Sequence, residues 1–340
     1  MYVYDISLVI PVCHGGLYLR AALDSILALE YPGDRMELLV TGLATDEDTH
    51  QAVAQTAAAA PFAVRYIPCS QPNRAAQLNL ACAKASGRLL AFTDDDCILP
   101  PDWLRAIETA ISAKLDIGAV GGRDDVLAES AFDLALDWVL NSLVGGGRYR
   151  LGQVGSRGAG YYPKLWNMAV PREVAESVAL PACNDIPGVF DDSLPAHEDV
   201  ELMHRIEASD RKLVYVPSIR VSHSRDTTFL SFERRNFRMA RVCRREGLHR
   251  FPHRILSGAC IGAVVMAAAA IAIPAWRVFI AAVVGLYAAV LFVSAAVGAK
   301  AQRSLAAALY IPLMLAGLHF ARGLGYLAPA FLRRGMTKKV

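Results

Sequence analysis

Two uncharged runs near the carboxyl end constrain the fold of this 340-residue chain more than any other feature. Leu256–Ile273 and Val278–Ala299 contain no charged side chain, and each approaches the ~20 residues that cross the hydrocarbon core of a bilayer. Between them, Pro274–Arg277 predicts a tight turn with an interfacial tryptophan. A buried core helix is the alternative for each run. We therefore expect a membrane domain over residues 255–330, with two or three transmembrane helices.

The first 114 residues alternate between short β-rich runs and helix-like runs. The expected strands are Ile6–Pro11, Met36–Val40, Ala63–Ile67 and Leu89–Thr93, and the expected helices are Leu17–Leu29, Thr49–Ala59, Arg74–Ala85 and Pro101–Lys114. This alternation is typical of a parallel sheet covered by helices. In such sheets ligands bind beyond the carboxyl ends of the strands, so chemistry is expected there.

Composition narrows the class of protein. Nearly all acidic residues lie before residue 250, which separates a soluble domain from the apolar end of the chain. A net charge of +3 does not indicate a polycation that binds nucleic acid. The seven cysteines include no CxxC pair, so they suggest neither a zinc cluster nor a disulfide framework, and they fit a reducing compartment. The amino-terminal segment lacks the pattern of a secretory signal peptide.

Three consecutive carboxylates, Asp94, Asp95 and Asp96, follow an apolar strand. Adjacent acids repel one another, and a hard divalent cation held by carboxylate oxygens would compensate. If the strand continued through them, Asp94 and Asp96 would point to the same face. The alternative is a solvated acidic turn that caps the helix starting near Pro101.

Two further candidate sites lie around residues 195–225. Glu198 and Asp199 are expected at the start of a helix, where the helix dipole favours carboxylates. One of them could instead act as a general base for a hydroxyl nucleophile. His223 follows the expected strand Lys212–Pro217, and it could be structural or complete a metal site with the aspartates.

A basic segment over residues 229–254 precedes the first apolar run. Four of its arginines are spaced 4, 3 and 4 residues apart, so a helix would place them in one stripe: Arg234, Arg238, Arg241 and Arg245. This pattern predicts an interfacial helix that meets anionic lipid headgroups. Alternatively, one or two of Arg235, Arg238 and Arg241 contact a diphosphate leaving group or a lipid phosphate.

Residues 145–160 are rich in glycine and basic side chains, which is unsuited to the interior of a helix or strand. We expect a mobile loop there. Long loops in compact domains often serve as lids, although plain flexibility is the alternative.

Together these segments resemble the family 2 glycosyltransferases with a GT-A fold, from about Ser7 to about Arg245. The matching stretches are Ser7–Val12, Tyr18–Leu27, Asn73–Asn79, Asp94–Asp96 with Pro101–Trp103, Asn167–Glu173, His197–Leu202, Tyr215–Pro217 and His223. The resemblance implies an α/β, Rossmann-like GT-A catalytic domain over residues 1–228, followed by the basic segment and an all-α membrane domain.

The resemblance also implies roles for individual residues. Asp94 and Asp96 would hold Mg²⁺ or Mn²⁺ against the nucleotide diphosphate, with His223 as a further ligand. Asp199 would be the catalytic base, with Glu198 beside it. The implied nucleotide-binding residues are Pro11, Asp46, Arg74, Asp94 and Asp95.

One departure from the family pattern concerns the nucleobase. Thr41 and Gly42 stand where many relatives carry an acidic pair that contacts the base, and only Asp46 matches the motif. A QxxRW motif is also missing from the end of the domain, which argues against a processive synthase. The chain is more similar to single-addition enzymes such as the succinoglycan glucosyltransferase group.

The implied activity is inverting transfer of a sugar from a nucleotide-diphosphate donor to a lipid-linked saccharide, in cell-surface polysaccharide or glycolipid synthesis. Transfer to polyprenyl phosphate itself is an alternative. So are a hydrolase of nucleotide-sugars and a non-catalytic membrane scaffold with a degenerate transferase domain.

Charge around the apolar runs predicts the orientation in the membrane. Basic residues beside a span are retained inside, which places the arginines before Leu256 in the cytoplasm. Leu256–Ile273 would cross outward and Val278–Ala299 would return, leaving Lys300 and Arg303 inside. We expect a multi-pass protein of the cell inner membrane with a cytoplasmic catalytic domain.

A third apolar run, Leu305–Ala321, contains Pro312 and His319 and is followed by Arg322. Ionisable groups are costly in lipid and usually face protein or water. We therefore favour a broken or shallow segment with a cytoplasmic tail, and its length leaves a full crossing as the alternative. We expect His319 and Arg322 to face the catalytic domain or a lipid phosphate.

Overall fold

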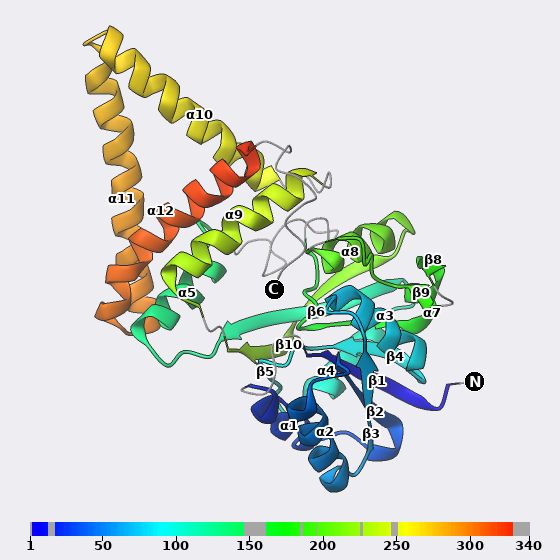
Figure 1. Cartoon of the computed structure of the whole chain (residues 1–340). Coiled ribbons are helices and arrows are strands. Elements are labelled where there is room, and N and C mark those ends of the chain that lie inside the picture. Colours follow the sequence, from blue (N-terminus) through cyan, green and yellow to red (C-terminus); the bar gives the residue numbers. More distant parts are fainter. Residues whose placement is uncertain are drawn as a thin grey trace. The chain divides into compact units, whose positions relative to one another are not determined.

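The chain forms two compact units, coloured along the sequence in Figure 1. The computed structural model describes residues 2–12, 18–145, 161–183, 186–194, 196–224, 227–245 and 251–328. The sheet unit comprises Met1–Leu127 and Arg148–Arg225, and the helical unit comprises Ala128–Gly147 and Asp226–Val340. The predicted catalytic domain over residues 1–228 therefore differs from the sheet unit, because residues 128–147 belong with the carboxyl-terminal helices.

An eight-stranded mixed sheet organises the sheet unit. Its strands, in spatial order, are β3 (Ala63–Cys69), β2 (Met36–Leu43), β1 (Tyr4–Pro11), β4 (Gly87–Phe92), β7 (Met168–Pro171), β6 (Ile117–Val126), β10 (Lys212–His223) and β5 (Cys97–Ile98). The first four are parallel, with Leu8 beside Leu38 on one side and Ala91 on the other. β7 runs antiparallel between β4 and β6, and β10 is parallel to β6.

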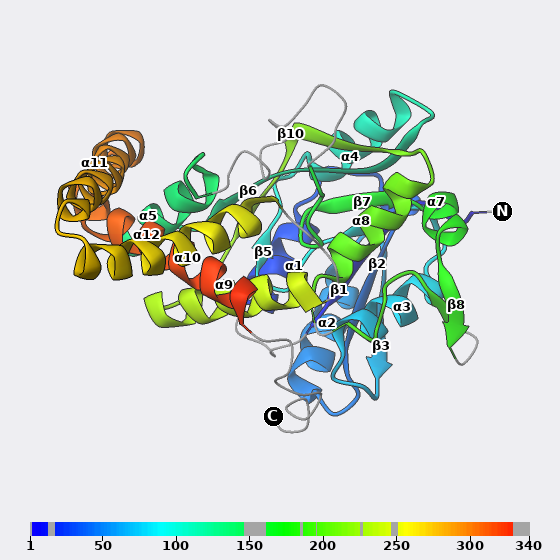
Figure 2. The same ribbon diagram turned by 90° about the horizontal axis from the view of Figure 1, so that it is seen from above.

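Helices cover both faces of this sheet (Figure 2). They are α1 (Leu19–Leu27), α2 (Glu47–Ala59), α3 (Arg74–Lys84), α4 (Trp103–Ser112), α7 (Arg172–Ser177) and α8 (Glu198–Ala208). Successive strand residues face opposite sides, so Leu8 packs with α1, α2 and α4 and Val9 packs with α3, α7 and α8. A short 3₁₀ helix, Gly33–Arg35, and the hairpin of β8 (Leu180–Cys183) and β9 (Ile186–Gly188) complete the described elements.

The expected secondary structure of the first 114 residues is confirmed, with boundaries that differ by a few residues. The four expected strands correspond to β1, β2, β3 and β4, and the four expected helices correspond to α1, α2, α3 and α4. Local signals explain this agreement. Asp46 caps α2 by accepting a hydrogen bond from the Thr49 amide, and Asn73 caps α3 by accepting one from the Ala76 amide.

Five helices make up the described part of the helical unit. They are α5 (Ala131–Asn141), α9 (Phe229–Arg245), α10 (Phe251–Ala272), α11 (Trp276–Gln302) and α12 (Leu305–Leu327). α12 contacts each of the other four (Figure 1). Close approach of α12 to α9 depends on Gly325, because a Cβ there would lie 2.3 Å from the Phe237 carbonyl oxygen.

Three of these helices are long and apolar enough to cross a membrane, judged by length and composition: Arg254–Ala272, Trp276–Gln302 and Leu305–Leu327. The turn predicted at Pro274–Arg277 is confirmed in its first half, because α10 ends at Ala272 and α11 begins at Trp276, so Trp276 and Arg277 are already helical. The predicted break at Pro312 is wrong. α12 is a single helix that contains this proline.

His319 and Arg322 bond within the helical unit. His319 Nδ1 lies 3.0 Å from the Tyr287 hydroxyl, and its Nε2 lies 2.8 Å from the Val144 carbonyl oxygen. Arg322 donates to Asn236 Oδ1 at 2.9 Å and to the Gly145 carbonyl at 3.2 Å. Val144 and Gly145 lie within residues 1–228, so the predicted contact of His319 and Arg322 with that part of the chain is present, although both partners belong to the helical unit. Contact with a lipid phosphate stays a prediction.

Candidate active site

The acidic cluster after β4 is a turn rather than the end of a strand. β4 ends at Phe92, and Asp94–Asp96 lead through the turn into β5. The two aspartates have different partners: Asp94 pairs with Arg74, whereas Asp96 pairs with His223. The strand alternation from which Asp94 and Asp96 were expected to point the same way does not extend this far, because β4 ends at Phe92.

Asp96 and His223 form the first half of the site. His223 is the last residue of β10 and pairs with Cys97 of β5, which brings its Nε2 to 3.0 Å from Asp96 Oδ1. The Ser224 amide donates to the Asp96 carbonyl at 2.8 Å and fixes the turn. The indole of Trp166 lies against the His223 ring, with centroids 5.1 Å apart.

A carboxylate and an imidazole at this separation fit a divalent cation. His223 is 7% exposed, and its Nδ1 has no hydrogen-bond partner among the described residues. The Cys97 thiol is close enough to be a third donor, but burial raises its pKa well above the usual value and keeps it protonated. Carboxylate oxygen with imidazole nitrogen suits Mn²⁺ or Mg²⁺, although hard cations prefer the oxygen.

Arg74, the first residue of α3, links the two acidic segments. It donates through Nη2 to Asp94 Oδ1, and its Nε lies 3.7 Å from Glu198 Oε1. Burial is the largest effect on Glu198 and raises its pKa; Arg74 opposes this, while Asp199 and Asp94 add to it. Arg74 therefore holds two carboxylates that would otherwise repel each other.

Asp199 lies in the first turn of α8 and is 8% exposed. Its Oδ1 accepts a hydrogen bond from the Val200 amide at 2.8 Å, and its Oδ2 lies 3.5 Å from Lys164 Nζ. The residue before the helix, His197, has φ of 71°, a left-handed conformation that is uncommon for residues other than glycine. Such strain often occurs where a chain must present functional groups.

The turn Lys164–Asn167 contributes side chains to both halves of the site. Its amide-to-carbonyl hydrogen bond, from Asn167 to Lys164, measures 2.7 Å. The Asn167 side chain is buried and bonds with the Trp103 indole and the carbonyls of Arg123 and Ile219. The anchored turn thereby presents Lys164 to Asp199 and Trp166 to His223.

The remaining predicted nucleotide-binding residues lie on different elements of the sheet unit. Pro11 ends β1, and Asp95 is a half-buried member of the acidic turn. Asp46 accepts two hydrogen bonds from Thr49, at 3.0 Å from its amide and 2.7 Å from its hydroxyl, so it has a structural role as a helix cap. Contact of these residues with a nucleotide stays a prediction.

The arginines assigned to a leaving group or lipid phosphate lie on α9 in the helical unit. Arg235 and Arg238 are exposed, and Arg241 is partly buried. The opposite face of α9 buries Phe232 and Ala240, so the helix is amphipathic as predicted. The predicted loop at 145–160 lies outside the described residues from position 146 onward.

Sequence reasoning did not identify Lys164, Trp166 or Cys97 as parts of the site. Lys164 and Trp166 lie within three residues of the stretch Asn167–Glu173 that carried part of the family resemblance. Their proximity to that stretch was the available signal. Cys97 follows directly after the acidic cluster and is buried in β5.

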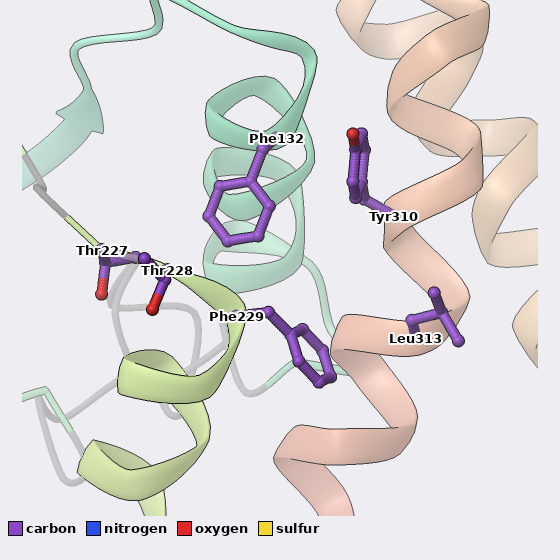
Figure 3. A pocket seen from close by; sticks show the side chains of 6 residues that line it. All are labelled: Phe132, Thr227, Thr228, Phe229, Tyr310 and Leu313. Carbon is purple, nitrogen blue, oxygen red and sulfur yellow. The ribbon is translucent and has the colours of Figure 1, made fainter.

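An open apolar pocket of about 380 Å³ lies in the helical unit (Figure 3). Its lining comes from α5, from the start of α9 and from α12: Phe132, Thr227, Thr228, Phe229, Tyr310 and Leu313. The rings of Phe132 and Tyr310 meet edge to face, with centroids 5.7 Å apart. α12 also exposes Leu309 next to this pocket along the helix, with 74% of its surface accessible.

Comparison with known proteins supports the fold and part of the family resemblance. Residues 7–153 match the family described as Glycosyl transferase family 2. Glycosyltransferase AglE of Haloferax volcanii is 28% identical over 118 residues, which make up 34% of this chain and 38% of that protein. The match thus spans well under half of this curated relative.

A solved structure resembles nearly the whole chain. The mannosyltransferase PcManGT from Pyrobaculum calidifontis, in complex with GDP-Man and Mn²⁺, aligns with a TM-score of 0.64 over 96% of this chain and 88% of that one, at 18% identity. The chain accordingly has a GT-A glycosyltransferase fold, Rossmann-like and mixed α/β, followed by three apolar helices.

Proposed function

We propose that this chain is an inverting, metal-dependent glycosyltransferase that moves a sugar from a nucleotide-diphosphate donor to a lipid-linked saccharide. One observation carries the proposal. The acidic turn after β4, the start of α8, the end of β10 and Arg74 converge at one edge of a GT-A sheet. Ligands of such sheets bind at the carboxyl ends of the strands. Membership of the succinoglycan glucosyltransferase group is part of the same proposal.

The similar structure of PcManGT is a complex with GDP-Man and Mn²⁺, which supports a nucleotide-sugar donor and a divalent cation here. We assign the cation to Asp96 and His223, with Mg²⁺ or Mn²⁺ as the ion. Asp94 would join them when Arg74 turns from Asp94 to a donor phosphate. The bound cation would supply positive charge against the diphosphate as it leaves.

The residues of this chain account for the rest of the reaction. The acceptor hydroxyl gives its proton to Asp199 and forms a bond to the anomeric carbon. The bond from that carbon to the diphosphate breaks on the opposite face, and its electron pair leaves with the nucleoside diphosphate. Arg74 stabilises the developing charge because its guanidinium can bind phosphate oxygens in pairs.

The helical unit supports a lipid-linked acceptor. The apolar pocket between α5, α9 and α12 opens beside Leu309 on a helix that could span a bilayer, so a hydrocarbon chain of the acceptor would suit it. The exposed Arg235 and Arg238, with Arg241, would bind the lipid phosphate or the bilayer surface. The basic residues before the first apolar helix support the further proposal that the catalytic domain lies on the cytoplasmic face of the inner membrane.

A donor screen tests the proposed activity. Membranes containing the full chain are incubated with individual radiolabelled nucleotide-sugars, Mn²⁺ and a lipid extract, and the products are extracted into organic solvent. We expect label in the lipid fraction with one donor, and a loss of about 10²–10⁴-fold in rate for Asp199→Asn. Donor binding should survive in that variant, because the base acts on the acceptor.

The outcomes separate the alternatives. Label on added polyprenyl phosphate, without any saccharide acceptor, would indicate a polyprenyl-phosphate glycosyltransferase. Free labelled sugar without lipid would indicate a hydrolase. If no donor yields any product, the proposed enzymatic activity is contradicted and a non-catalytic scaffold is favoured.

The acceptor assignment has its own test. Leu313→Trp fills the pocket, whereas Leu309→Trp adds the same bulk outside the pocket lining. We expect the first variant to raise KM for the lipid acceptor several-fold and to leave KM for the donor unchanged. Equal acceptor KM values in both variants would remove the pocket from acceptor binding.

A further inference from the structure

The ion pair between Lys164 and Asp199 joins the proposed catalytic base to a residue outside every recognised motif of the chain. Lys164 Nζ lies 3.5 Å from Asp199 Oδ2, with the two side chains 22% and 11% exposed. The other carboxylate oxygen, Oδ1, accepts the Val200 amide at 2.8 Å. Both oxygens are therefore held, one by the start of α8 and the other by Lys164.

The position of Lys164 is fixed by the turn that carries it. Its carbonyl accepts the Asn167 amide at 2.7 Å, and Leu165 inside the turn is 2% exposed. The Asn167 side chain is anchored by three hydrogen bonds, including one of 2.9 Å from the Trp103 indole. The backbone of Lys164 is therefore fixed, and only the torsions of its side chain can change the position of Nζ.

The charges around Asp199 explain why a cation is needed there. Glu198 is its neighbour in sequence, and Asp94 faces Glu198 across Arg74. Among the described residues, Asp94, Glu198 and Asp199 thus gather near the cations Arg74 and Lys164. Arg74 is within ion-pair distance of Asp94 and Glu198, while Lys164 is within that distance of Asp199. Like charges near a carboxylate favour its protonated form, which cannot accept a proton.

We propose that Lys164 is a positioning residue for the base: it keeps Asp199 ionised and aims Oδ2 at the acceptor hydroxyl. This inference rests on the proposed function. A carboxylate oxygen has two lone pairs, so Oδ2 can accept from Lys164 and from the hydroxyl together. During transfer the hydroxyl proton passes to Asp199, and Lys164 keeps its own proton throughout.

A direct titration of Asp199 tests the ionisation without any donor. The full chain, purified in detergent, is labelled with aspartate carrying ¹³C in the carboxyl group, and the Asp199 signal is assigned by its loss in Asp199→Asn. We expect Lys164→Met to raise the pKa of Asp199 by about 1 pH unit or more. Lys164→Arg should keep the wild-type value.

A matched control is Lys212→Met, which removes an exposed lysine paired with Asp116 outside the site. It should leave the Asp199 titration unchanged. Melting temperatures of all variants show whether each is folded, and rescue by Lys164→Arg separates charge from loss of packing. An unchanged Asp199 titration in folded Lys164→Met would overturn the proposal.

Kinetics then test the role in transfer, using the donor found in the screen. For Lys164→Met, the acid limb of the pH profile of kcat/KM should move to higher pH, by the same amount as the pKa of Asp199. The loss of rate should grow to about ten-fold at pH values below the wild-type acid limb, and it should vanish on the plateau above that limb. A higher donor KM with no movement of the acid limb would show that Lys164 binds the donor, which contradicts the proposal.

The two proposals can fail separately. If the wild-type chain transfers no sugar and Lys164→Met still shifts the Asp199 titration, the glycosyl-transfer function is wrong and the control of Asp199 by Lys164 stands. If transfer occurs and neither the titration nor the acid limb moves, the function stands and the role of Lys164 is wrong.

Discussion

Glu233 gives the helical unit a pH-dependent stability. It lies on α9 against α12, where a Cβ on Gly317 would come within 2.3 Å of its Oε1. That oxygen is buried and has no hydrogen-bond partner among the described residues. Burial raises the pKa of Glu233 from its usual 4.5 to about 7, and Arg322 acts in the opposite direction. The folded protein therefore keeps a proton on Glu233 to a higher pH than an exposed glutamate would.

The sign of the effect follows from which state binds the proton more tightly. Because the pKa is higher in the folded state, the stabilisation is complete below pH 4.5 and is lost as the pH rises through 7. A full rise from 4.5 to about 7 corresponds to about 3 kcal/mol for an enclosed group. Glu233 is only partly buried, so solvent screening reduces the contribution to about 1–2 kcal/mol.

Glu233→Gln keeps the shape of the side chain and removes the titration. At pH 8 we expect this variant to melt about 4 °C higher than the wild type, and at pH 5 we expect no difference. Melting is followed by intrinsic fluorescence of the full chain in detergent between pH 5 and pH 9. Glu129→Gln, which changes an exposed carboxylate, is the control. If the wild type and Glu233→Gln show parallel pH dependence across this range, the reasoning is refuted.

Three other predictions concern the metal, helix packing and topology. Asp96→Ala should weaken nucleotide binding as well as rate, and full activity in excess EDTA would contradict the assigned cation site. Gly325→Ala should destabilise the helical unit by about 1–3 kcal/mol through overpacking against α9, whereas Gly262→Ala, with open space around it, should be nearly neutral in a melting assay. Compartment-specific reporters fused to Gln302 and Val340 should both report the cytoplasm; an external signal at Val340 alone would show a full third crossing, and one at Gln302 would overturn the orientation of the catalytic domain.

The sequence predicts the strands and helices of the first 114 residues well because their signals are local. Apolar runs separated by capping residues mark β1 to β4 and α1 to α4. The same approach failed at Asp94–Asp96, where alternation was extended beyond Phe92 into a turn. It also failed at Pro312, because tertiary packing can keep a helix continuous through a proline.

In the candidate site, too, residues marked by local sequence signals could be predicted, whereas residues positioned by distant contacts could not. Asp199 and His223 could be singled out because each lies at a recognisable strand end or helix start. Lys164 could not, since its place depends on Asn167 reaching Trp103, 64 residues away, and the carbonyl of Ile219, 52 residues away. Hydrogen bonds of that range leave no periodic pattern in the sequence.

The membership of α5 in the helical unit has consequences for how the protein is made and handled. Gln302 donates to Asp137 of α5 at 2.9 Å across a separation of 165 residues. At translation rates of about 5–20 residues per second, α5 must wait on the order of ten to thirty seconds for α11 and α12 to be synthesised. During that time its apolar side chains, Leu136 and Val139 among them, need a chaperone or the membrane surface. For the same reason, cutting the chain after residue 228 would leave α5 without its partners, so a soluble catalytic fragment would also need residues 128–147 replaced by a short polar linker.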